Sequence, residues 1–153
     1  MDGAMSEKHK KEIGRQADYP YRLDIQTRWS DNDMFGHVNN VLYQRFFEHI
    51  VVAFLRDACG IDLMKAPVIT FAAESHCKFL RPLSYPAGVV AGLRIDQMGR
   101  TSARYGLALF EQGCDEAAAE GHWIHVFVDR QTQRPVPIPD DVRAVFERHR
   151  RTT

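Results

Sequence analysis

The segment RWSDNDMFGHVNN, residues 28–40, gathers carboxylate, amide and imidazole side chains around one glycine. Asp33 and His37 stand four residues apart, and Gly36 between them permits the tight backbone path that would bring the two side chains together. A carboxylate held in such a turn could activate water as a general base or attack an acyl carbon directly. The segment is therefore a candidate reaction centre.

The residues that follow predict a helix whose first turn faces this carboxylate. Asn39 or Asn40 suits the N-cap of a helix that begins at Val41. The first amides of a helix have no partner within it and lie at the positive end of its dipole. They would stabilise a developing oxyanion, and the loss of one such donor typically costs about 3 kcal/mol.

Two other interpretations of the segment stay open. Asp, Asn and Gly before a helix are also ordinary turn and cap residues, which need no chemical role. The spacing of Asp31, Asp33 and His37 would also allow a metal site on a loop. No other carboxylate or histidine cluster in the sequence is spaced to complete such a ligand set.

A strand and a long helix must position the segment. Apolar and polar residues alternate over residues 23–29, the pattern of a half-buried strand. Apolar residues then recur every three or four positions over residues 41–58, and Gly60 suits the position after a helix end. About nineteen helical residues would span about 28 Å. A helix this apolar is expected to be buried nearly all round.

The remainder of the chain predicts β-structure and one short helix. Short turns separate the later strands, which predicts an antiparallel meander, and the final helix begins near Asp140 or Asp141. The fold class is α+β, with a five-stranded antiparallel sheet wrapped around one long central helix. The later strands are expected at residues 69–79, 89–98, 102–111 and 117–129. In the first of them, the residues that alternate with polar neighbours are Ile69, Phe71, Ala73, Cys77 and Phe79.

Length, charge and cysteine content narrow the class of protein. The chain has 153 residues, enough for one domain with a real core, and its 20 basic and 20 acidic residues cancel. Neither nucleic acid nor a membrane is therefore expected as a partner. Three scattered cysteines indicate a reducing compartment, the cytoplasm. A polar leader without an apolar run predicts a disordered tail over residues 1–18 and a single domain over residues 19–153.

The sequence RWSDNDMFGHVNNVLYQRFFE, together with FLRPLSYPAG, GRTS and VFVDRQTQRPVPIP, resembles hotdog-fold acyl-CoA thioesterases of the 4-hydroxybenzoyl-CoA thioesterase type. The resemblance runs from about Tyr21 to the final helix. It implies that Asp33 is the catalytic carboxylate and that an amide at the helix start, at about Asn40, polarises the thioester carbonyl. The segment is also similar to the Asp-x-Asn-x-His motif of plant acyl-carrier-protein thioesterases. Asp33 and His37 match that motif, but Phe35 replaces its asparagine.

This resemblance implies hydrolysis of an acyl-CoA thioester to a carboxylic acid and free CoA, without a metal or organic cofactor. It also implies a homodimer or homotetramer with the acyl groove at the subunit interface, and the exposed sheet edges of a lone subunit make such pairing physically reasonable. Three alternatives remain: a module that binds acyl-CoA or acyl carrier protein without turnover, a thioesterase for acyl carrier protein, and a metal-dependent hydrolase.

Three residues are candidates for substrate contacts. Tyr43 could line the acyl pocket, although an aromatic residue at a helix edge is more often a packing residue. Ser102, in GRTS, resembles a position that is often near the pantetheine arm. Arg81 could contact the phosphates of CoA, as could other arginines that are each more simply explained as surface residues: Arg100, Arg104, Arg130 and Arg134.

Two pairs of polar residues on the expected strands have mainly structural interpretations. Glu74 and His76 share a face and could reach the site of a partner subunit, but a solvated strand face explains them as well. His122 and His125 resemble a metal-binding pair. Residues three apart on a strand point to opposite faces, however, so these two cannot readily share one ion.

Overall fold

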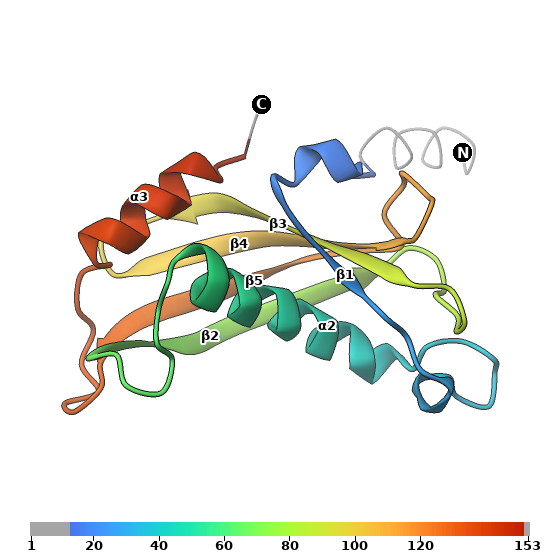
Figure 1. Ribbon diagram of the computed structural model, residues 1–153, viewed down its shortest axis with the longest axis horizontal. Coiled ribbons are helices and arrows are strands. Elements are labelled where there is room, and N and C mark those ends of the chain that lie inside the picture. The colour runs from blue at the N-terminus through green and yellow to red at the C-terminus, as the bar shows by residue number, and fades with distance from the viewer. Residues whose placement is uncertain (1–12, 152–153) are drawn as a thin grey trace, which may run out of the picture.

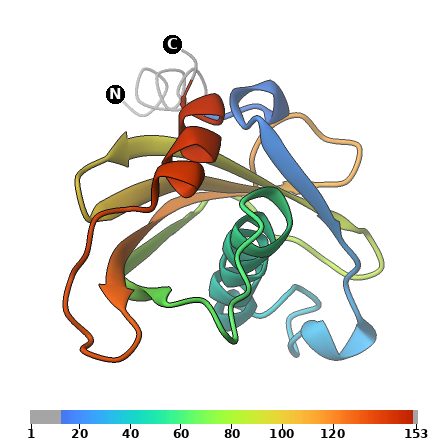
Figure 2. The same cartoon turned by 60° about the vertical axis from the view of Figure 1, so that its left-hand side comes forward.

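A computed structural model describes residues 13–151 and contains one five-stranded antiparallel sheet. The sheet curves around helix α2 (Asn40–Ala53), and a second helix, α3 (Asp140–Arg148), packs at one end (Figure 1, Figure 2). The predicted α+β hotdog fold is therefore confirmed. In spatial order the strands are β1 (Tyr21–Ile25), β3 (Val89–Met98), β4 (Ser102–Glu111), β5 (Ala119–Asp129) and β2 (Val68–Phe79).

The central helix has the predicted length, but its last part changes type. A π-helical segment, η3 (Phe54–Ala58), follows α2 without a break, and Gly60 comes next with a φ of 69°. The helix packs closely on the sheet at Phe47, which is fully buried. A Cβ at Gly121 of β5 would lie 2.8 Å from Phe47 Cε2 and would collide with the His76 carbonyl oxygen. Glycine at this strand position therefore allows the helix to approach.

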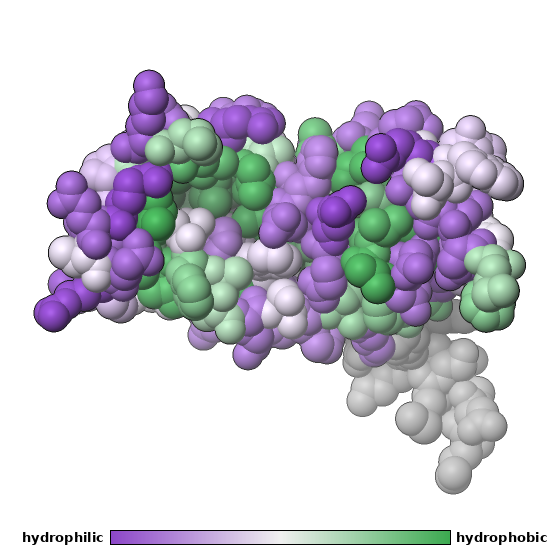
Figure 3. Space-filling model, turned by 90° about the horizontal axis from the view of Figure 1, so that it is seen from below, coloured by the Kyte–Doolittle hydropathy of each residue, from purple (hydrophilic) through white to green (hydrophobic). Residues whose placement is uncertain are grey.

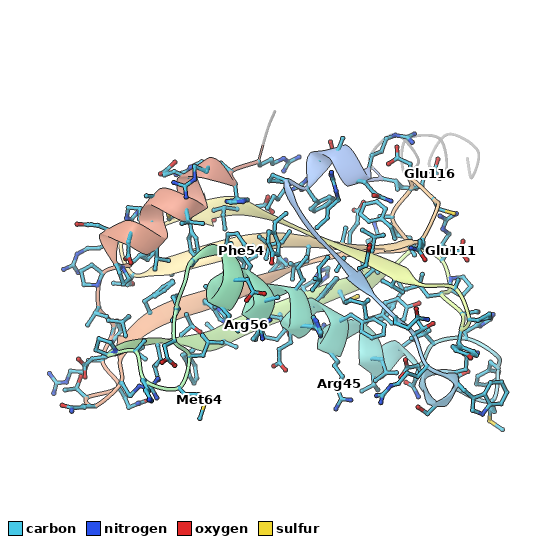
Figure 4. The ribbon with its side chains drawn as sticks, in the orientation of Figure 1. Arg45, Phe54, Arg56, Met64, Glu111 and Glu116 are labelled. Atoms are coloured by element: carbon cyan, nitrogen blue, oxygen red, sulfur yellow. The ribbon has the colours of Figure 1, made fainter. Side chains whose placement is uncertain are left out.

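One side of the central helix remains open in the single chain. Val41 is 75% exposed, and Arg45 and Arg56 project from the side that faces away from the sheet (Figure 4). The expectation that the helix is buried nearly all round is therefore wrong for one copy of the chain. Within residues 13–151, no helix combines the length and apolar character needed to cross a membrane.

The first strand is shorter than the alternation over residues 23–29 suggests. Ile25 pairs with Val89, the first residue of β3, so the residues after Ile25 have no partner strand. The chain instead forms a 3-10 turn, η2 (Trp29–Asp31), in which Trp29 is 78% exposed. The prediction that the strand continues to Trp29 is wrong because the available partner, and not the alternation, determines where this edge strand ends.

The connection between β2 and β3 crosses the sheet. β3, β4 and β5 are consecutive antiparallel neighbours, as expected, but β2 pairs with β5 and β1 pairs with β3. The expected meander is therefore limited to three strands. As a result, β2 forms one edge of the sheet, and most of its side chains are exposed.

Residues 13–19 lie against the face of the sheet opposite α2. Gln16–Asp18 form a 3-10 turn, η1, and the following Tyr19 is 2% exposed. A Cβ at Gly92 would lie 2.8 Å from Tyr19 Cβ, and the Arg94 guanidinium lies 4.6 Å from the tyrosine ring centroid. Residues 13–18, which the sequence placed in a disordered tail over residues 1–18, are therefore packed on the sheet, and the rest of that prediction, residues 1–12, lies outside the described part of the chain.

Candidate active site

Asp33 lies in a closed turn between β1 and α2. The Asp33 N–H donates to the His37 carbonyl oxygen at 2.8 Å, and the Gly36 N–H donates to the Asp33 carbonyl oxygen at 3.0 Å. Gly36 has a φ of 81°, a conformation that residues with side chains rarely adopt. The predicted tight turn at Gly36 is therefore present. We name residues 32–38 the Asp33 turn.

The segment after β2 supports the Asp33 turn. The Val38 N–H donates to the Leu83 carbonyl oxygen at 2.7 Å, and the Ser84 hydroxyl donates to the Gly36 carbonyl oxygen at 3.0 Å. The sequence indicated only a strand break in RPLSYPAG, so this supporting role was missed. No local pattern reveals it, because the contact depends on where the end of β2 meets the start of α2.

The two aspartates of this region have different environments. Asp31 is 6% exposed, and its Oδ2 accepts the Arg28 N–H at 2.8 Å, so Asp31 stabilises the η2 turn. Asp33 is half-buried, and its Oδ1 accepts the Phe35 N–H at 2.9 Å. Its Oδ2 has no hydrogen-bond partner among residues 13–151. Asp33 is therefore the carboxylate that can meet a substrate or water.

The alternative of a metal site at Asp31, Asp33 and His37 is not supported. The Asp31 carboxylate is already engaged by the Arg28 backbone and lies 4.0 Å from the Arg28 Nε. In the described part of the chain, no group of three or more histidine, cysteine, aspartate or glutamate side chains is arranged to hold a metal ion.

Helix α2 begins beside the Asp33 turn with a capped first turn. Asn39 is the N-cap, and its Oδ1 accepts the Val41 N–H at 3.0 Å. Asn40 is the first helical residue, and its N–H has no acceptor within the helix. No hydrogen bond joins this N–H to any other residue that the structure describes. Asn39 is thus the cap, and Asn40 offers a donor at the positive end of the helix dipole.

Tyr43 and Arg81, two candidates for substrate contacts, both have hydrogen-bond partners within the chain. Tyr43 is 2% exposed, and its hydroxyl accepts the Leu83 N–H at 3.1 Å, so it helps to anchor the segment that supports the turn. Arg81, two residues earlier, is exposed and donates to the Glu116 carbonyl oxygen at 3.0 Å. Substrate contacts of both residues stay predictions.

Ser102, the third candidate, lies far from Asp33 in the single chain. It lines a cavity of about 340 Å³ together with Arg104, on the face of the sheet opposite α2. The two side chains alternate along β4 with Ala103 and Tyr105, which are buried in the core. One copy of the chain therefore does not bring Ser102 to the Asp33 turn.

A second cavity, of about 370 Å³, lies between the far half of the central helix and the beginning of β2. Val51 and Leu55 of the helix and Val68 of β2 line it with apolar surface, and Trp123 and His125 of β5 complete its wall. We name it the α2–β2 cavity. At a rise of 1.5 Å per residue, the central helix extends about 20 Å from its first residue to this cavity. The cavity and the Asp33 turn of one chain are therefore well separated.

His122 and His125 point to opposite faces of β5, as strand geometry predicts. His122 Nδ1 lies 3.0 Å from an Arg104 nitrogen on the outer face, and its Nε2 contacts the Glu74 carboxylate. His125 is buried on the inner face, where its Nδ1 lies 3.0 Å from the Tyr105 hydroxyl oxygen. The two histidines therefore cannot share a metal ion.

The buried His125 makes stability depend on pH. Burial lowers the pKa of His125 from 6.5 to about 4. The unfolded chain takes up this proton below about pH 6.5 and the folded chain only near pH 4, so the free energy of unfolding falls as the pH is lowered through this window. The expected slope is about 1.4 kcal/mol per pH unit.

Urea unfolding between about pH 7 and pH 4 measures this slope. The double variant Tyr105→Phe/His125→Phe removes both partners of the buried hydrogen bond and should lose this part of the pH dependence. An unchanged slope in the double variant would show that other groups cause it.

Comparison with known proteins gives the same family as the fold. The sequence profile of the thioesterase-like superfamily matches residues 27–146. The chloroplastic acyl-acyl carrier protein thioesterase ATL3 of Arabidopsis thaliana is 27% identical over 129 residues, which cover 82% of this chain and 67% of that protein.

Solved structures agree with this result. The PA5185 protein of Pseudomonas aeruginosa strain PAO1 is similar with a TM-score of 0.89 and 38% sequence identity, covering 92% of this chain and 99% of that chain. A thioesterase of Thermus thermophilus, complexed with coenzyme A and Zn, is similar with a TM-score of 0.72 and 26% sequence identity. The match covers 84% of this chain and 98% of that chain. The profile match, the hotdog fold and these relatives together show that the chain belongs to the thioesterase-like superfamily.

Proposed function

We propose that the protein hydrolyses acyl-CoA thioesters, with the Asp33 carboxylate as its reactive group. The observation that carries this proposal is an unpartnered carboxylate oxygen of Asp33 in a supported turn beside the unpaired N–H of Asn40. A thioester carbonyl oxygen bound by this N–H would lie at the positive end of α2, where developing negative charge is stabilised. His37, on the same turn, would position the carbonyl or the carboxylate.

The proposed reaction balances without a cofactor. Asp33 takes a proton from water, the water oxygen attacks the thioester carbon, and the carbonyl electron pair moves to the oxygen held by Asn40 N–H. When the carbonyl re-forms, the C–S bond breaks and the departing thiolate takes the proton from Asp33. Direct attack by Asp33 through an anhydride is the other route. A single turnover in ¹⁸O-labelled water distinguishes them, because only the anhydride route can leave label in Asp33.

Two copies of the chain complete the proposed site. β2 is a 12-residue edge strand whose two ends carry different features. Its Phe79 end packs on Tyr43 near the Asp33 turn, with ring centroids 5.0 Å apart, whereas its Val68 end lines the α2–β2 cavity. Antiparallel pairing of β2 with a two-fold mate would place the Asp33 turn of one copy beside the cavity of the other.

The surface around β2 supports this pairing. Seen from below, hydrophobic residues gather in one area toward the cavity and another toward the Asp33 turn, with a hydrophilic band between them (Figure 3). Met64 is 83% exposed at the cavity end (Figure 4), and Met34, Phe35 and Val41 are 75–92% exposed at the other end. Exposed apolar areas of this kind mark interaction surfaces. A dimer is the smallest assembly that covers them, and a tetramer would pair two such dimers.

The acyl group could be delivered by coenzyme A or by acyl carrier protein, and a relative supports each alternative. The Thermus thioesterase is complexed with coenzyme A, which favours CoA, whereas the Arabidopsis relative is an acyl-acyl carrier protein thioesterase. Arg45 of α2 and Arg56 of η3, on the open side of the central helix, could meet phosphates or an acidic carrier protein equally well. Both carriers therefore belong in the first assay.

Release of free thiol from a panel of thioesters tests the proposal. Short, long and aromatic acyl groups are presented on CoA and on acyl carrier protein, with and without a chelator. We expect turnover of acyl-CoA that the chelator does not change. Binding of these thioesters without turnover of any would instead identify a binding module, and loss of turnover with the chelator would identify a metal-dependent hydrolase.

A further inference from the structure

The wall of the α2–β2 cavity contains two buried polar side chains, Trp123 and His125. They are 8% and 6% exposed and project from the same face of β5, with ring centroids 6.1 Å apart. Neither Trp123 Nε1 nor His125 Nε2 has a hydrogen-bond partner among residues 13–151, but the Trp123 nitrogen is also shielded from any molecule in the cavity. His125 Nε2 is therefore the nitrogen that a ligand in the cavity can reach. A buried polar group without a partner typically costs about 1–3 kcal/mol, so most such groups in folded proteins are paired.

His125 offers a donor, not an acceptor, to the cavity. The Tyr105 hydroxyl is fully buried, and its partner is His125 Nδ1 at 3.0 Å. Burial raises the pKa of Tyr105, so the hydroxyl stays protonated. Its O–H group donates a hydrogen bond to His125 Nδ1. Burial also lowers the pKa of His125 to about 4, so the ring is neutral at neutral pH. A neutral imidazole that accepts at Nδ1 carries its own proton on Nε2.

An apolar wall with one accessible, unpaired N–H donor favours one class of ligand. The aliphatic lining accommodates hydrocarbon, and the donor requires an oxygen with free lone pairs. Glu48 and Arg130 also line the cavity with opposite charges, and the Arg130 guanidinium already donates to the Ala66 and Leu63 carbonyl oxygens. Because the wall offers a carboxylate no uncompensated positive charge, a neutral hydroxyl or carbonyl oxygen suits it better.

Building on the proposed thioesterase function, we infer that the α2–β2 cavity receives the acyl group and that His125 selects acyl groups carrying a hydroxyl or oxo oxygen over plain alkyl chains. The thioester carbon would lie at the Asp33 turn of the other copy, so His125 contacts only the remote part of the substrate. A site that hydrogen-bonds a substrate oxygen discriminates against the analogue lacking it, because the donors of the site are then left unpaired.

Four CoA thioesters of equal chain length test this inference: octanoyl-CoA and its 3-hydroxy, 3-oxo and 8-hydroxy derivatives. For at least one oxygenated thioester we expect a kcat/KM about tenfold above that of octanoyl-CoA, the effect of one hydrogen bond. In Tyr105→Phe/His125→Phe this ratio should fall toward one while octanoyl-CoA is still hydrolysed. Tyr105→Phe alone retains His125 but no longer fixes its proton on Nε2, so it should lower the preference only in part, by about threefold.

Equal kcat/KM values for all four thioesters, or a preference that survives in the double variant, would overturn the inference and leave thioester hydrolysis intact. If the double variant does not fold, Tyr105→Phe alone tests the inference, and an unchanged preference in it would overturn the inference. If the wild type hydrolyses none of the four, the wider panel of thioesters decides whether the proposed function fails. Calorimetric dissociation constants for the four thioesters then decide the inference: tighter binding of an oxygenated one supports it, and equal binding overturns it.

Discussion

Asp33→Asn is expected to lower kcat for thioester hydrolysis by about 10²- to 10⁴-fold, the usual contribution of a positioned general base. The substituted amide can still accept the Phe35 N–H through its oxygen, so the Asp33 turn should keep its shape. Urea unfolding measured beside the kinetics should show a change of no more than about 0.5 kcal/mol. Loss of rate without loss of stability would assign the chemistry to the carboxylate.

Asp31→Asn is the matched control, two residues earlier in the same segment. Asp31 is buried against the Arg28 N–H, so this change should leave kcat within about threefold and lower the free energy of unfolding by about 1 kcal/mol. The reverse result, with full kcat in Asp33→Asn and loss of rate in Asp31→Asn, would sink the proposed mechanism.

Mixing two inactive variants is expected to restore activity if the site is shared between copies. Asp33→Asn removes the carboxylate, and Val52→Phe fills the α2–β2 cavity that Val52 lines from the helix. Each homodimer then lacks one half of every site. In a mixed dimer, the intact Asp33 turn of one copy meets the intact cavity of the other, while the second site lacks both halves.

Random refolding of equal amounts makes half of the dimers mixed, each with one working site, so about one quarter of wild-type activity should return. Val52→Leu changes the volume less and is the control that should stay active. Mixed dimers that form but stay inactive would contradict the shared site. They would place the carboxylate and the acyl cavity in the same copy, which the helix length argues against.

The parts of the fold that were predicted correctly are those whose cause is local. The apolar recurrence over residues 41–58 specifies a helix wherever it packs, and it ends at Gly60, which has a positive φ. The Asp33 turn depends on Gly36 for its backbone path and on Asn39 for the helix cap, both within the segment itself. The resemblance added the choice of Asp33 over Asp31, which stays a prediction that the burial of Asp31 supports.

The faces of β2 could not be predicted from its alternation. Its pairing with β5 shifts between Ala72 and Glu74, so an extra residue interrupts the strand. Cys77 packs on the core, whereas Phe71, which the alternation places on the same face, is 62% exposed. A bulge is defined by two strands together, and the sequence of one strand does not reveal it.

The α2–β2 cavity was missed for a similar reason. It forms where the end of the central helix, the beginning of β2 and the middle of β5 meet, and no motif marks that meeting point. The sequence suggests His125 only as a metal-binding partner of His122. Its importance depends on Tyr105 from the neighbouring strand, which fixes the proton on the side facing the cavity.

The Asp33 turn is held by main-chain hydrogen bonds, from Asp33 N–H to His37, from Gly36 N–H to Asp33 and from Val38 N–H to Leu83. Met34 and Phe35, at its tip, are 92% and 78% exposed and carry none of this support through their side chains. Their side chains can therefore be exchanged during evolution without displacing the Asp33 carboxylate. The side chains at the tip of the turn and the carboxylate at its base are free to diverge at different rates.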